Sequence, residues 1–579
     1  MDKNQNDLNH LRHTTAHLLA KAVLELWPGS HNAIGPAIEN GFYQDFDLGQ
    51  VKISEADFPK IEQKMTDILP TWKQFEKKEV SAQQAKELFK HNPYKYELAE
   101  EFAKEGKRIT VNDPGNFLDL CKGGHIKNPS KELKHFKLLK IAGAYWRGDE
   151  KNKMLTRIYG TVFPTKEELD HYLWQQEEAK KRDHKKLGQQ LELFVISQEI
   201  GGGLPIFLPK GRILRDVVEQ FITDEKKKRG YQFVWSPHLA ESKVYKRSGH
   251  WQKYDAMYPP IKLEDEEYVP KPMNCPHHFQ VYLAKPHSYR ELPIRIAENG
   301  TVYRNEKSGE LNGLLRVRSA TIDATHTILR HDQIESEMNG VLDLIDDIFK
   351  AFGFKEYRAR VSIRDPKTPD KYMGKVEVWD QAEKVLIDAA KKRGISYFVG
   401  EGEAAFYGPK IDFLVKDSLG REWQLSTVQL DFVQPENFDL NYTDEQGKQA
   451  KPAVLHIAIL GSIERFIGIL IEEYAGAFPL WLSPIQVIIL PISEKQLDYA
   501  QKVNNELLKN GIRSEVDDQN ETLGKKIRNW EMQKVPYIAV VGQREQDQQM
   551  VAPRKRGEGN KEAISIETFI EELKVEKNN

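Results

Sequence analysis

Residues 292–318 constrain the fold of this chain more than any other segment. They begin with the apolar run LPIRIAENGTVY, end in LLRVR, and hold a polar, turn-rich loop between the two. This pattern predicts two strands joined by a hairpin loop, which Arg304 and Arg316 flank and which carries Glu306. Arginine offers a planar fork of donors to phosphate oxygens, and a carboxylate accepts from the exocyclic amine of adenine. The segment therefore predicts a nucleotide-binding hairpin, and the alternative is an exposed hairpin with an ion pair.

Length and composition set the outer bounds of the interpretation. The chain has 579 residues, too many for one hydrophobic core, so two to four domains are expected. No stretch approaches the roughly 18 apolar residues of a membrane span, and the polar start MDKNQNDLNH argues against a targeting peptide. Two cysteines form no disulfide framework, so we expect a cytoplasmic protein. The net charge of -2 gives no overall attraction to nucleic acid, so any RNA binding would depend on local basic patches. The candidates are 180–186, 225–229 and 554–556, and the alternative is that each is ordinary solvated surface.

The patterning changes along the chain and predicts an α+β multidomain fold. Residues 1–182 mix helical patterns with short strands and close with a charged connector helix, about 165–187, expected to stop at Gly188. Residues 183–482 alternate apolar runs with hairpin-like turns, which favours a large antiparallel sheet with flanking helices. Residues 483–579 alternate strands and helices, which is typical of a small α/β domain with a partly parallel sheet.

Both cysteines lie beside histidines. Cys121 precedes His125 in LCKGGH, and Cys275 lies in KPMNCPHHF. His13 and His17 are four residues apart, so on a helix they share one face. With Cys121 and His125 they have the residue types of a tetrahedral zinc site, and the alternative is a capped helix beside a buried thiol. Cys275 has no partner at zinc-finger spacing, so spacing alone does not predict a metal there.

Several blocks resemble those of threonyl-tRNA synthetases, a family of class II aminoacyl-tRNA synthetases. GYQFVWSP (230–237), the loop at 304–316 and HIAILGSIERFIGILIEEYAG (456–476) resemble the three signature motifs of the class. HTTAHLLAKAVLELWPGS, LCKGGH and HFKLLKIAGAYWRGD resemble the editing domain of the family. The resemblance implies an α/β editing domain with a helical connector (1–182), a class II catalytic domain (183–482) and an α/β anticodon-binding domain (483–579).

The resemblance also implies roles for particular residues. The implied ATP-binding residues are Arg304, Glu306, Arg316, Gln424, Thr427 and Arg465, with Arg304 and Arg465 as the catalytic pair. The implied zinc ligands are Cys275, His326 and His456, and the implied amino-acid pocket contains Met273, Ala324, Tyr407, Lys410, Gln429 and Ser462. The implied editing residues are His13, His17, Lys95, Asp119, Cys121 and His125, and the implied anticodon readers are Glu545 and Arg554.

The implied activity is ATP-dependent attachment of threonine to tRNA(Thr), with ATP, Mg²⁺, L-threonine and one Zn²⁺ per subunit of a homodimer. In the family this zinc binds the amino and hydroxyl groups of threonine and so rejects valine. The editing cluster is expected to work without a metal and to hydrolyse serine mischarged onto tRNA(Thr). Such a second site is needed because one methyl group is worth roughly 1–3 kcal/mol of discrimination.

The strand SATIDATHTIL (319–329) departs from the family pattern. Ile322 stands at a glutamine position, and Ala324 stands where the family has the aspartate that holds the amino group of threonine. Alternate residues of a strand share a face, so Ile322, Ala324 and His326 are predicted to face the pocket while Asp323 points away. Loss of one partner of a buried ion pair costs about 3–5 kcal/mol, or roughly two to four decades in affinity or rate.

Two more departures concern His277 and the start of the chain. His277 replaces a usual glycine and is predicted to crowd the zinc site or to compete as a ligand. Because the blocks that resemble the editing domain begin near residue 13, we expect this protein to lack the small ubiquitin-like N-terminal domain common in bacterial members. The changed strand leaves an alternative open, a synthetase-derived RNA-binding or trans-editing factor whose threonine activation is impaired by Ile322 and Ala324.

Overall fold

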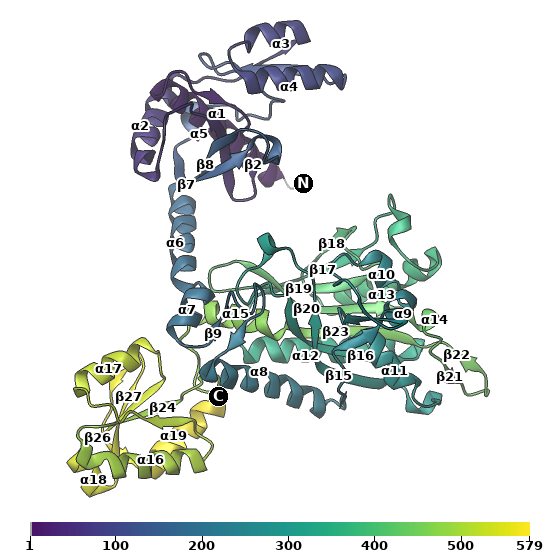
Figure 1. The fold of residues 1–579 in the computed structure, drawn as a ribbon, viewed down its shortest axis with the longest axis vertical. Coiled ribbons are helices and arrows are strands. Elements are labelled where there is room, and N and C mark those ends of the chain that lie inside the picture. The colour runs from purple at the N-terminus through teal and green to yellow at the C-terminus, as the bar shows by residue number, and fades with distance from the viewer. Residues whose placement is uncertain (1–2, 579) are drawn as a thin grey trace. The chain divides into compact units, whose positions relative to one another are not determined.

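The computed structural model describes residues 3–578, which divide between two compact units, Met1–Glu177 and Glu178–Asn579 (Figure 1). Among the described residues, no helix has the length and apolar character needed to cross a membrane. Cys121 and Cys275 are free thiols. The domain boundaries expected after 182 and 482 stay predictions.

The first unit packs helices on a mainly antiparallel sheet. The long helix α1 buries Leu11, Leu18, Leu19 and Val23 against the sheet β1-β3-β8-β7, because these apolar residues share one helical face. A separate sheet, β4-β5-β6, packs with α3 and α4 around its own small core. The helices are α1 (Lys3–Leu26), α2 (Phe58–Ile68), α3 (Ala82–Leu88), α4 (Pro93–Lys104), α5 (Pro129–Glu132) and α6 (Lys166–Arg182). The strands are β1 (His31–Asn32), β2 (Ala37–Ile38), β3 (Gly41–Asp47), β4 (Glu76–Val80), β5 (Ile109–Asp113), β6 (Asp119–Leu120), β7 (His135–Tyr145) and β8 (Met154–Phe163).

The connector helix ends earlier than the sequence predicts. α6 stops at Arg182, and Asp183 caps a new helix, α7 (His184–Gln190), by accepting from the amide of Lys185. Gly188 therefore lies inside α7, where a Cβ would come within 2.2 Å of the Phe194 ring. It is a close-packing position, so the prediction that Gly188 stops the helix is wrong.

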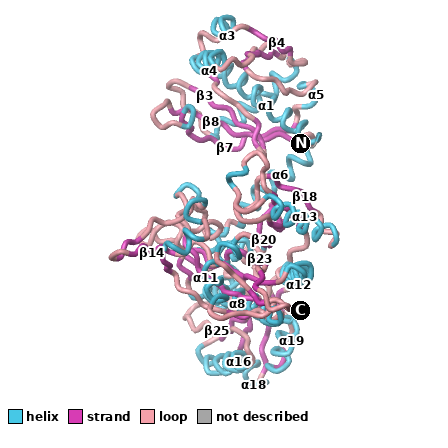
Figure 2. The backbone as a smooth tube through the Cα atoms, turned by 90° about the vertical axis from the view of Figure 1, so that its right-hand side faces the viewer, coloured by secondary structure: helices cyan, strands magenta, loops and turns pink. Residues whose placement is uncertain are grey.

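The second unit contains the large antiparallel sheet that the alternating pattern predicts. In the described part of the chain its order is β11-β15-β16-β23-β20-β19-β17-β18, with parallel pairing only at the edge pairs β11–β15 and β17–β18. Strands β20 and β23 lie side by side near its centre (Figure 2). The strands are β11 (Gln232–Phe233), β15 (Ile294–Tyr303), β16 (Ser319–Leu329), β17 (Tyr357–Ile363), β18 (Tyr397–Glu401), β19 (Lys410–Lys416), β20 (Glu422–Asp431) and β23 (Ala453–Ser462).

Helices cover this sheet through amphipathic faces. In α12, Met338, Val341, Leu342, Ile345 and Phe349 follow the i, i+3, i+4 spacing and all enter the main core. The remaining helices around the sheet are α8 (Pro209–Lys228), α9 (Ser242–Arg247), α10 (His250–Lys253), α11 (Cys275–Leu283), α12 (Ile334–Ala351), α13 (Val376–Lys392), α14 (Gln434–Asn437) and α15 (Ile463–Glu473). Small strands accompany them, namely β9 (Phe194–Val195), β10 (Ile206–Phe207), β12 (Leu239–Glu241), β13 (Ile261–Leu263), β14 (Glu266–Pro270), β21 (Tyr442–Thr443) and β22 (Gln449–Ala450).

The predicted hairpin at 292–318 is present, but its second strand starts later. β15 and β16 pair antiparallel from Ile294–Ile328 to Tyr303–Ser319. The segment LLRVR precedes β16 as a turn, because Leu314 is drawn fully into the core beside α15. The prediction that LLRVR forms a strand is therefore wrong, and the loop between the strands is longer than expected.

The C-terminal part of the second unit is the predicted small α/β fold. β24 pairs parallel with β25 and β26, and β27 closes the sheet antiparallel. The segment 543–557 forms a short helix and a strand. The elements are β24 (Val487–Pro491), α16 (Leu497–Lys509), β25 (Ser514–Val516), α17 (Leu523–Met532), β26 (Tyr537–Val541), α18 (Gln543–Gln548), β27 (Met550–Lys555), β28 (Gly559–Asn560), β29 (Ile564–Ser565) and α19 (Ile566–Asn578).

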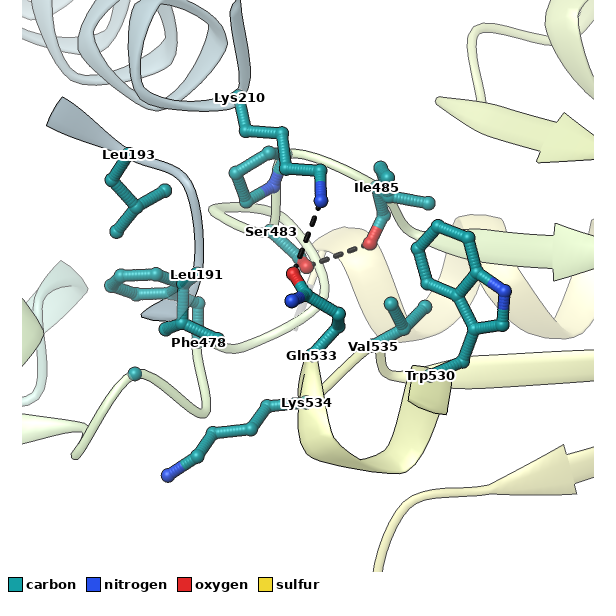
Figure 3. A pocket seen from close by; sticks show the side chains of 12 residues that line it. Leu191, Leu193, Lys210, Phe478, Ser483, Ile485, Trp530, Gln533, Lys534 and Val535 are labelled. Carbon is teal, nitrogen blue, oxygen red and sulfur yellow. Dashed lines mark hydrogen bonds between the residues drawn. The ribbon is translucent and has the colours of Figure 1, made fainter. Parts of the chain in front are cut away.

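A narrow, largely apolar cavity lies between this C-terminal α/β fold and the segment 191–210 of the same unit (Figure 3). Leu191 and Leu193 line it from one side, and Ile485 and Val535 from the other. Lys210 of α8 bridges the two parts by donating to the side chain of Gln533 at 3.1 Å. The contact joins the parts within one compact unit.

Candidate active site

A cavity of about 420 Å³ lies on the central sheet and gathers most of the predicted catalytic-domain residues. Its walls come from β16, β20 and β23, from the start of α11, and from the segment 403–410. The predicted residues that line it are Met273, Cys275, Arg304, Ala324, His326, Tyr407, Lys410, Thr427, Gln429 and His456. The predicted residues that do not line it are Glu306, Arg316, Gln424, Ser462 and Arg465.

Cys275, His326 and His456 come together in this cavity. All three are buried, and one ligand atom from each lies within 4.8 Å of the others. The sheet register explains the meeting, because His326 of β16 is paired directly with His456 of β23 and Cys275 begins α11. A thiol and two imidazoles are a donor set that suits zinc, and three protein ligands leave one position open for substrate.

Neighbouring groups fix which imidazole nitrogens are free. His456 Nε2 lies 2.8 Å from an Asp431 carboxylate oxygen, so Nε2 carries the proton that this oxygen accepts. The other ring nitrogen, Nδ1, is then unprotonated and has a free lone pair. His326 Nδ1 contacts His278 Nδ1 at 2.8 Å, and His278 Nε2 lies 3.3 Å from Glu298. A proton on Nε2 of His278, held by Glu298, leaves its Nδ1 to accept from His326 and frees His326 Nε2. The donor set therefore fits a metal ion.

Sequence reasoning missed these orienting residues. Asp431 ends β20, and Glu298 lies inside β15, where a carboxylate at a buried position signals a buried partner. His278 follows His277 in CPHH, but a doubled histidine gives no hint of which ring turns inward. His277 itself does not line the cavity and instead faces a groove with Pro237 and Phe438. The prediction that His277 crowds the metal site is wrong.

The changed strand presents the faces that the sequence predicts. Ile322, Ala324 and His326 line the cavity. Asp323 points away and is fully buried, where it pairs with Lys226 at 3.0 Å and accepts from the backbone amides of residues 459–461 at 2.9–3.1 Å. Every acceptor of Asp323 is thus engaged, so it cannot serve the pocket. Lys226 belongs to the basic patch at 225–229, yet it is buried and unavailable for RNA.

Two half-buried arginines, Arg304 and Arg465, each have a buried guanidinium nitrogen. Among the described residues, Nε of Arg304 and Nε of Arg465 are buried and have no hydrogen-bond partner. Burial and the neighbouring charge of Arg316 both lower the pKa of Arg465. Arg316 is paired with Glu306 at 2.7 Å and with Glu310 at 2.6 Å, as the ion-pair alternative for the hairpin predicts. Clustered guanidinium groups of this kind suit the binding of a polyanion.

The buried carboxylate of Asp412 organises another wall of the site. It accepts from Gln424 at 2.8 Å and Thr427 at 2.9 Å, and it pairs with Lys410 at 2.7 Å and Arg360 at 2.9 Å. Sequence reasoning missed Asp412, although a lone aspartate in the apolar strand KIDFLVK is a signal.

Two more predicted residues make side-chain bonds of their own. The Tyr407 hydroxyl donates to Gln429 at 2.9 Å inside the cavity. Ser462 instead caps α15 by accepting from the amide of Arg465 at 3.3 Å, so its place in the amino-acid pocket stays a prediction.

The predicted editing residues also meet, within the first unit. His13, His17, Cys121 and His125 each offer one ligand atom within 4.8 Å of the others. His13 and His17 lie on α1, and Cys121 and His125 follow β6. The Phe75 ring stacks on His125 with centroids 3.8 Å apart and closes one side of the cluster.

Asp119 links this cluster to Lys95. Its carboxylate lies 2.8 Å from Lys95 Nζ and 3.1 Å from His17 Nδ1, and all three groups are buried. Burial alone would lower the pKa of His17, but the interactions of its ring with Asp119 and Cys121 raise that pKa to about 9. Burial and the charge of His17 lower the pKa of His13 to about 3. His17 is therefore the proton carrier of the cluster at neutral pH.

Glu545 and Arg554 lie apart at the two ends of the β26–β27 hairpin. Glu545 accepts from the amide of Gly542, just after β26, while Arg554 is paired in register with Ile538 near the start of β26. Arg554 also pairs with Glu531 at 2.9 Å. They do not form one contact site, so their roles as anticodon readers stay predictions.

An antiparallel sheet with Arg304 just after β15 of the β15–β16 hairpin and Arg465 in the first turn of α15 is the arrangement of a class II aminoacyl-tRNA synthetase. The family model for the tRNA synthetase class II core domain (G, H, P, S and T) matches residues 258–474. An anticodon binding domain matches 486–576, and the threonyl and alanyl tRNA synthetase second additional domain matches 109–159.

Within this class, the chain belongs to the threonine–tRNA ligases. It is 48% identical over 573 residues to the threonine–tRNA ligase of Chloroherpeton thalassium, covering 97% of this chain and 87% of the relative. It is 49% identical over 570 residues to that of Porphyromonas gingivalis, covering 97% and 87%. A solved RNA binding domain of threonyl-tRNA synthetase from Cryptosporidium parvum is 35% identical, with a TM-score of 0.65 over 68% of this chain and 98% of that one.

The enzyme is thus a threonine–tRNA ligase that carries an editing domain and takes tRNA, ATP and an amino acid as substrates. The predicted family, fold class and activity are confirmed. The alternative of a non-activating RNA-binding factor is not favoured, because full-length relatives at about 48% identity are ligases.

Proposed function

We propose that the cavity on the central sheet activates threonine through the residues assigned above. The carboxylate of threonine attacks the α-phosphate of ATP, which yields threonyl-adenylate and releases pyrophosphate, and the adenylate then esterifies the terminal ribose of tRNA(Thr). The observation that carries this proposal is a pair of half-buried arginines, Arg304 and Arg465, whose buried Nε atoms lack hydrogen-bond partners among the described residues. Such groups are set to receive charge that develops on phosphate oxygens.

The ATP roles divide by position. Arg304 lines the cavity and would stabilise charge at the α-phosphate, whereas Arg316 and Arg465 lie beside each other and would bind the outer phosphates together with Mg²⁺. Glu306 holds Arg316 at 2.7 Å and is our candidate acceptor for the adenine amine. Gln424 and Thr427 are held by Asp412, and their bonds orient them toward bound nucleotide.

Cys275, His326 and His456 would hold the zinc ion. When bound, zinc would supply a Lewis acid for the amino and hydroxyl groups of threonine, which valine cannot satisfy. Tyr407, Gln429, Lys410 and Met273 would shape the rest of the amino-acid pocket, with Ser462 at its edge. Ala324 removes the carboxylate that the family pattern places at this position of β16, and Asp323 cannot replace it because it is engaged elsewhere.

The first unit would hydrolyse mischarged seryl-tRNA(Thr). Lys95, Asp119 and protonated His17 form a buried charge chain beside His13, Cys121 and His125. Such a chain can orient a water molecule and stabilise the developing oxyanion. Glu545 and Arg554 would contact anticodon bases.

We also propose a homodimer formed through the segment 230–237. Trp235 in this segment is 77% exposed, and the neighbouring β11 is the edge strand of the sheet. A large exposed aromatic residue beside a sheet edge is a typical association surface.

The direct test is amino-acid-dependent ATP–pyrophosphate exchange with threonine, serine and valine on zinc-loaded protein. We expect exchange with threonine, weaker exchange with serine, and none with valine. Exchange with valine at the threonine level would contradict recognition of the hydroxyl group. Absence of exchange with any of the three, while ATP still binds, would contradict activation by this pocket.

A further inference from the structure

His184, the first residue of α7, is buried at 1% exposure and contacts two other segments. Its Nδ1 lies 2.7 Å from a carboxylate oxygen of Glu472, near the end of α15. Its Nε2 accepts from the backbone amide of Leu314 at 3.1 Å. A neutral imidazole has one donor and one acceptor nitrogen, so both are fully used here.

The loop is shaped to receive this ring. Gly313 has φ of +52°, and a Cβ on it would come within 2.1 Å of His184 Nε2. Leu314 is fully buried, and on α15 a Cβ at Gly468 would come within 3.2 Å of it. Glycines at both contact points thus let the end of the loop sit between the imidazole and α15.

These contacts are close to the proposed phosphate-binding arginines. Arg316 follows Leu314 by two residues on the same loop, and Arg465 lies in the first turn of α15, the helix whose far end carries Glu472. Glu472 is itself held by Arg421 at 2.6 Å, so the anchor of the imidazole is fixed. One ring therefore ties the loop that carries one arginine to the helix that carries the other.

We propose that His184 is a positioning residue that holds the loop 304–316 against α15, so that Arg316 and Arg465 bind the same phosphate groups. The proposal rests on the ATP roles proposed for these arginines. Asp183, His184 and Glu472 could also suggest a metal site. That alternative fails because both nitrogens of His184 are already engaged, one by a carboxylate and one by a backbone amide.

The two bonds can be separated by substitution. In His184→Asn the amide nitrogen lies near the position of Nδ1, so it keeps the bond to Glu472 and loses the one to Leu314. In His184→Gln the amide oxygen lies near the position of Nε2, so it keeps the acceptor for Leu314. We expect His184→Asn to raise KM for ATP roughly 3- to 10-fold in threonine-dependent pyrophosphate exchange, the factor for one buried hydrogen bond. KM for threonine should stay within about twofold, and His184→Gln should recover most of the ATP effect.

Two controls lie on the same helix. Leu187→Ala opens a space in the core beneath α7 and should lower Tm without a selective change in KM for ATP. Lys186→Ala, at an exposed position, should change neither. Equal increases in both KM values for His184→Asn, or no difference between the Asn and Gln variants, would overturn the proposal.

Arg316→Ala separates this proposal from the proposed function on which it rests. If KM for ATP is unchanged in Arg316→Ala, the ATP role of the loop is contradicted and the positioning role with it. If Arg316→Ala is defective while His184→Asn is normal, only the positioning role is contradicted. A defect in both, with recovery in His184→Gln, supports the proposal.

Discussion

The two histidine–cysteine clusters use similar side chains in opposite electrostatic settings. In the first unit, the Asp119 carboxylate contacts both His17 and Lys95, and the pKa of His17 rises to about 9. In the catalytic cavity, burial and neighbouring imidazoles hold the pKa of His326 well below its usual range. The cluster in the first unit therefore keeps a proton on His17, and the cluster in the catalytic cavity keeps His326 neutral.

This difference supports the proposed division between water chemistry in the first cluster and metal binding in the catalytic cavity. A protonated imidazole has no lone pair for a metal, whereas a neutral imidazole whose other nitrogen is hydrogen-bonded presents one in a fixed direction. The position of the carboxylate in each cluster determines whether the neighbouring histidine holds a proton or presents a lone pair. Asp119 contacts a histidine that also contacts Cys121, while Asp431 holds only the outward nitrogen of His456. Similar ligand types thus do not imply similar sites.

The largest expected effect comes from removing one thiol from each cluster in turn. Cys275→Ser should lose bound zinc and reduce threonine-dependent exchange to background, a larger loss than the roughly 10- to 100-fold expected for an orienting partner. Cys121→Ser should keep zinc content and exchange, and slow seryl-tRNA deacylation at least about tenfold. Metal analysis after dialysis, together with both assays, checks this. Loss of zinc from Cys121→Ser would show that the first cluster binds metal too.

A smaller effect is expected from giving β16 a carboxylate that faces the catalytic cavity at position 324, as Asp119 faces the editing cluster. Ala324→Asp combined with Ile322→Gln should raise kcat/KM for threonine at least about tenfold, because the substrate ammonium gains a buried partner. Ala324→Asn with Ile322→Gln is the matched uncharged control. Pyrophosphate exchange measures both variants. Equal rates for the Asp and Asn variants would refute the account of the missing charge.

The smallest expected effect is a pH dependence confined to the editing cluster. The pKa of His17 is about 9 in the folded protein and near 6.5 when unfolded, so its contribution to stability is complete below pH 6.5 and lost as pH rises through 9. We expect the opening free energy of α1 to fall by on the order of 1–2 kcal/mol across this window. Hydrogen exchange of the full chain, corrected for intrinsic rates, measures it.

The same measurement on variants identifies the group responsible. His17→Gln should flatten the dependence of α1, and His171→Gln, at an exposed position on α6, should leave it intact. A slope that survives in His17→Gln would assign the titration to another residue of the cluster.

Periodicity and local chemistry were enough to predict much of the fold. The alternating runs of 183–482 became the central antiparallel sheet, and the strand–helix alternation after 483 became the small α/β fold. The alternation of side chains along a strand correctly predicted that Ile322, Ala324 and His326 face the cavity and that Asp323 points away from it. The errors occur where tertiary packing overrides local signals. Gly188 allows close packing against the Phe194 ring, and Leu314, predicted to lie in a strand, packs in the core instead.

The sequence by itself determined most element types, the faces of β16 and, through its resemblance to a family, which residues are proposed to carry the chemistry. Only the tertiary structure decided which polar groups those residues meet. Asp119, Glu298 and Asp412 are each distant in the sequence from most of their partners, Asp431 is 25 residues from His456, and no local pattern pairs them. Because proton positions and pKa values depend on contacts within a few ångströms, the chemistry of each cluster was settled by folding, not by its list of ligands.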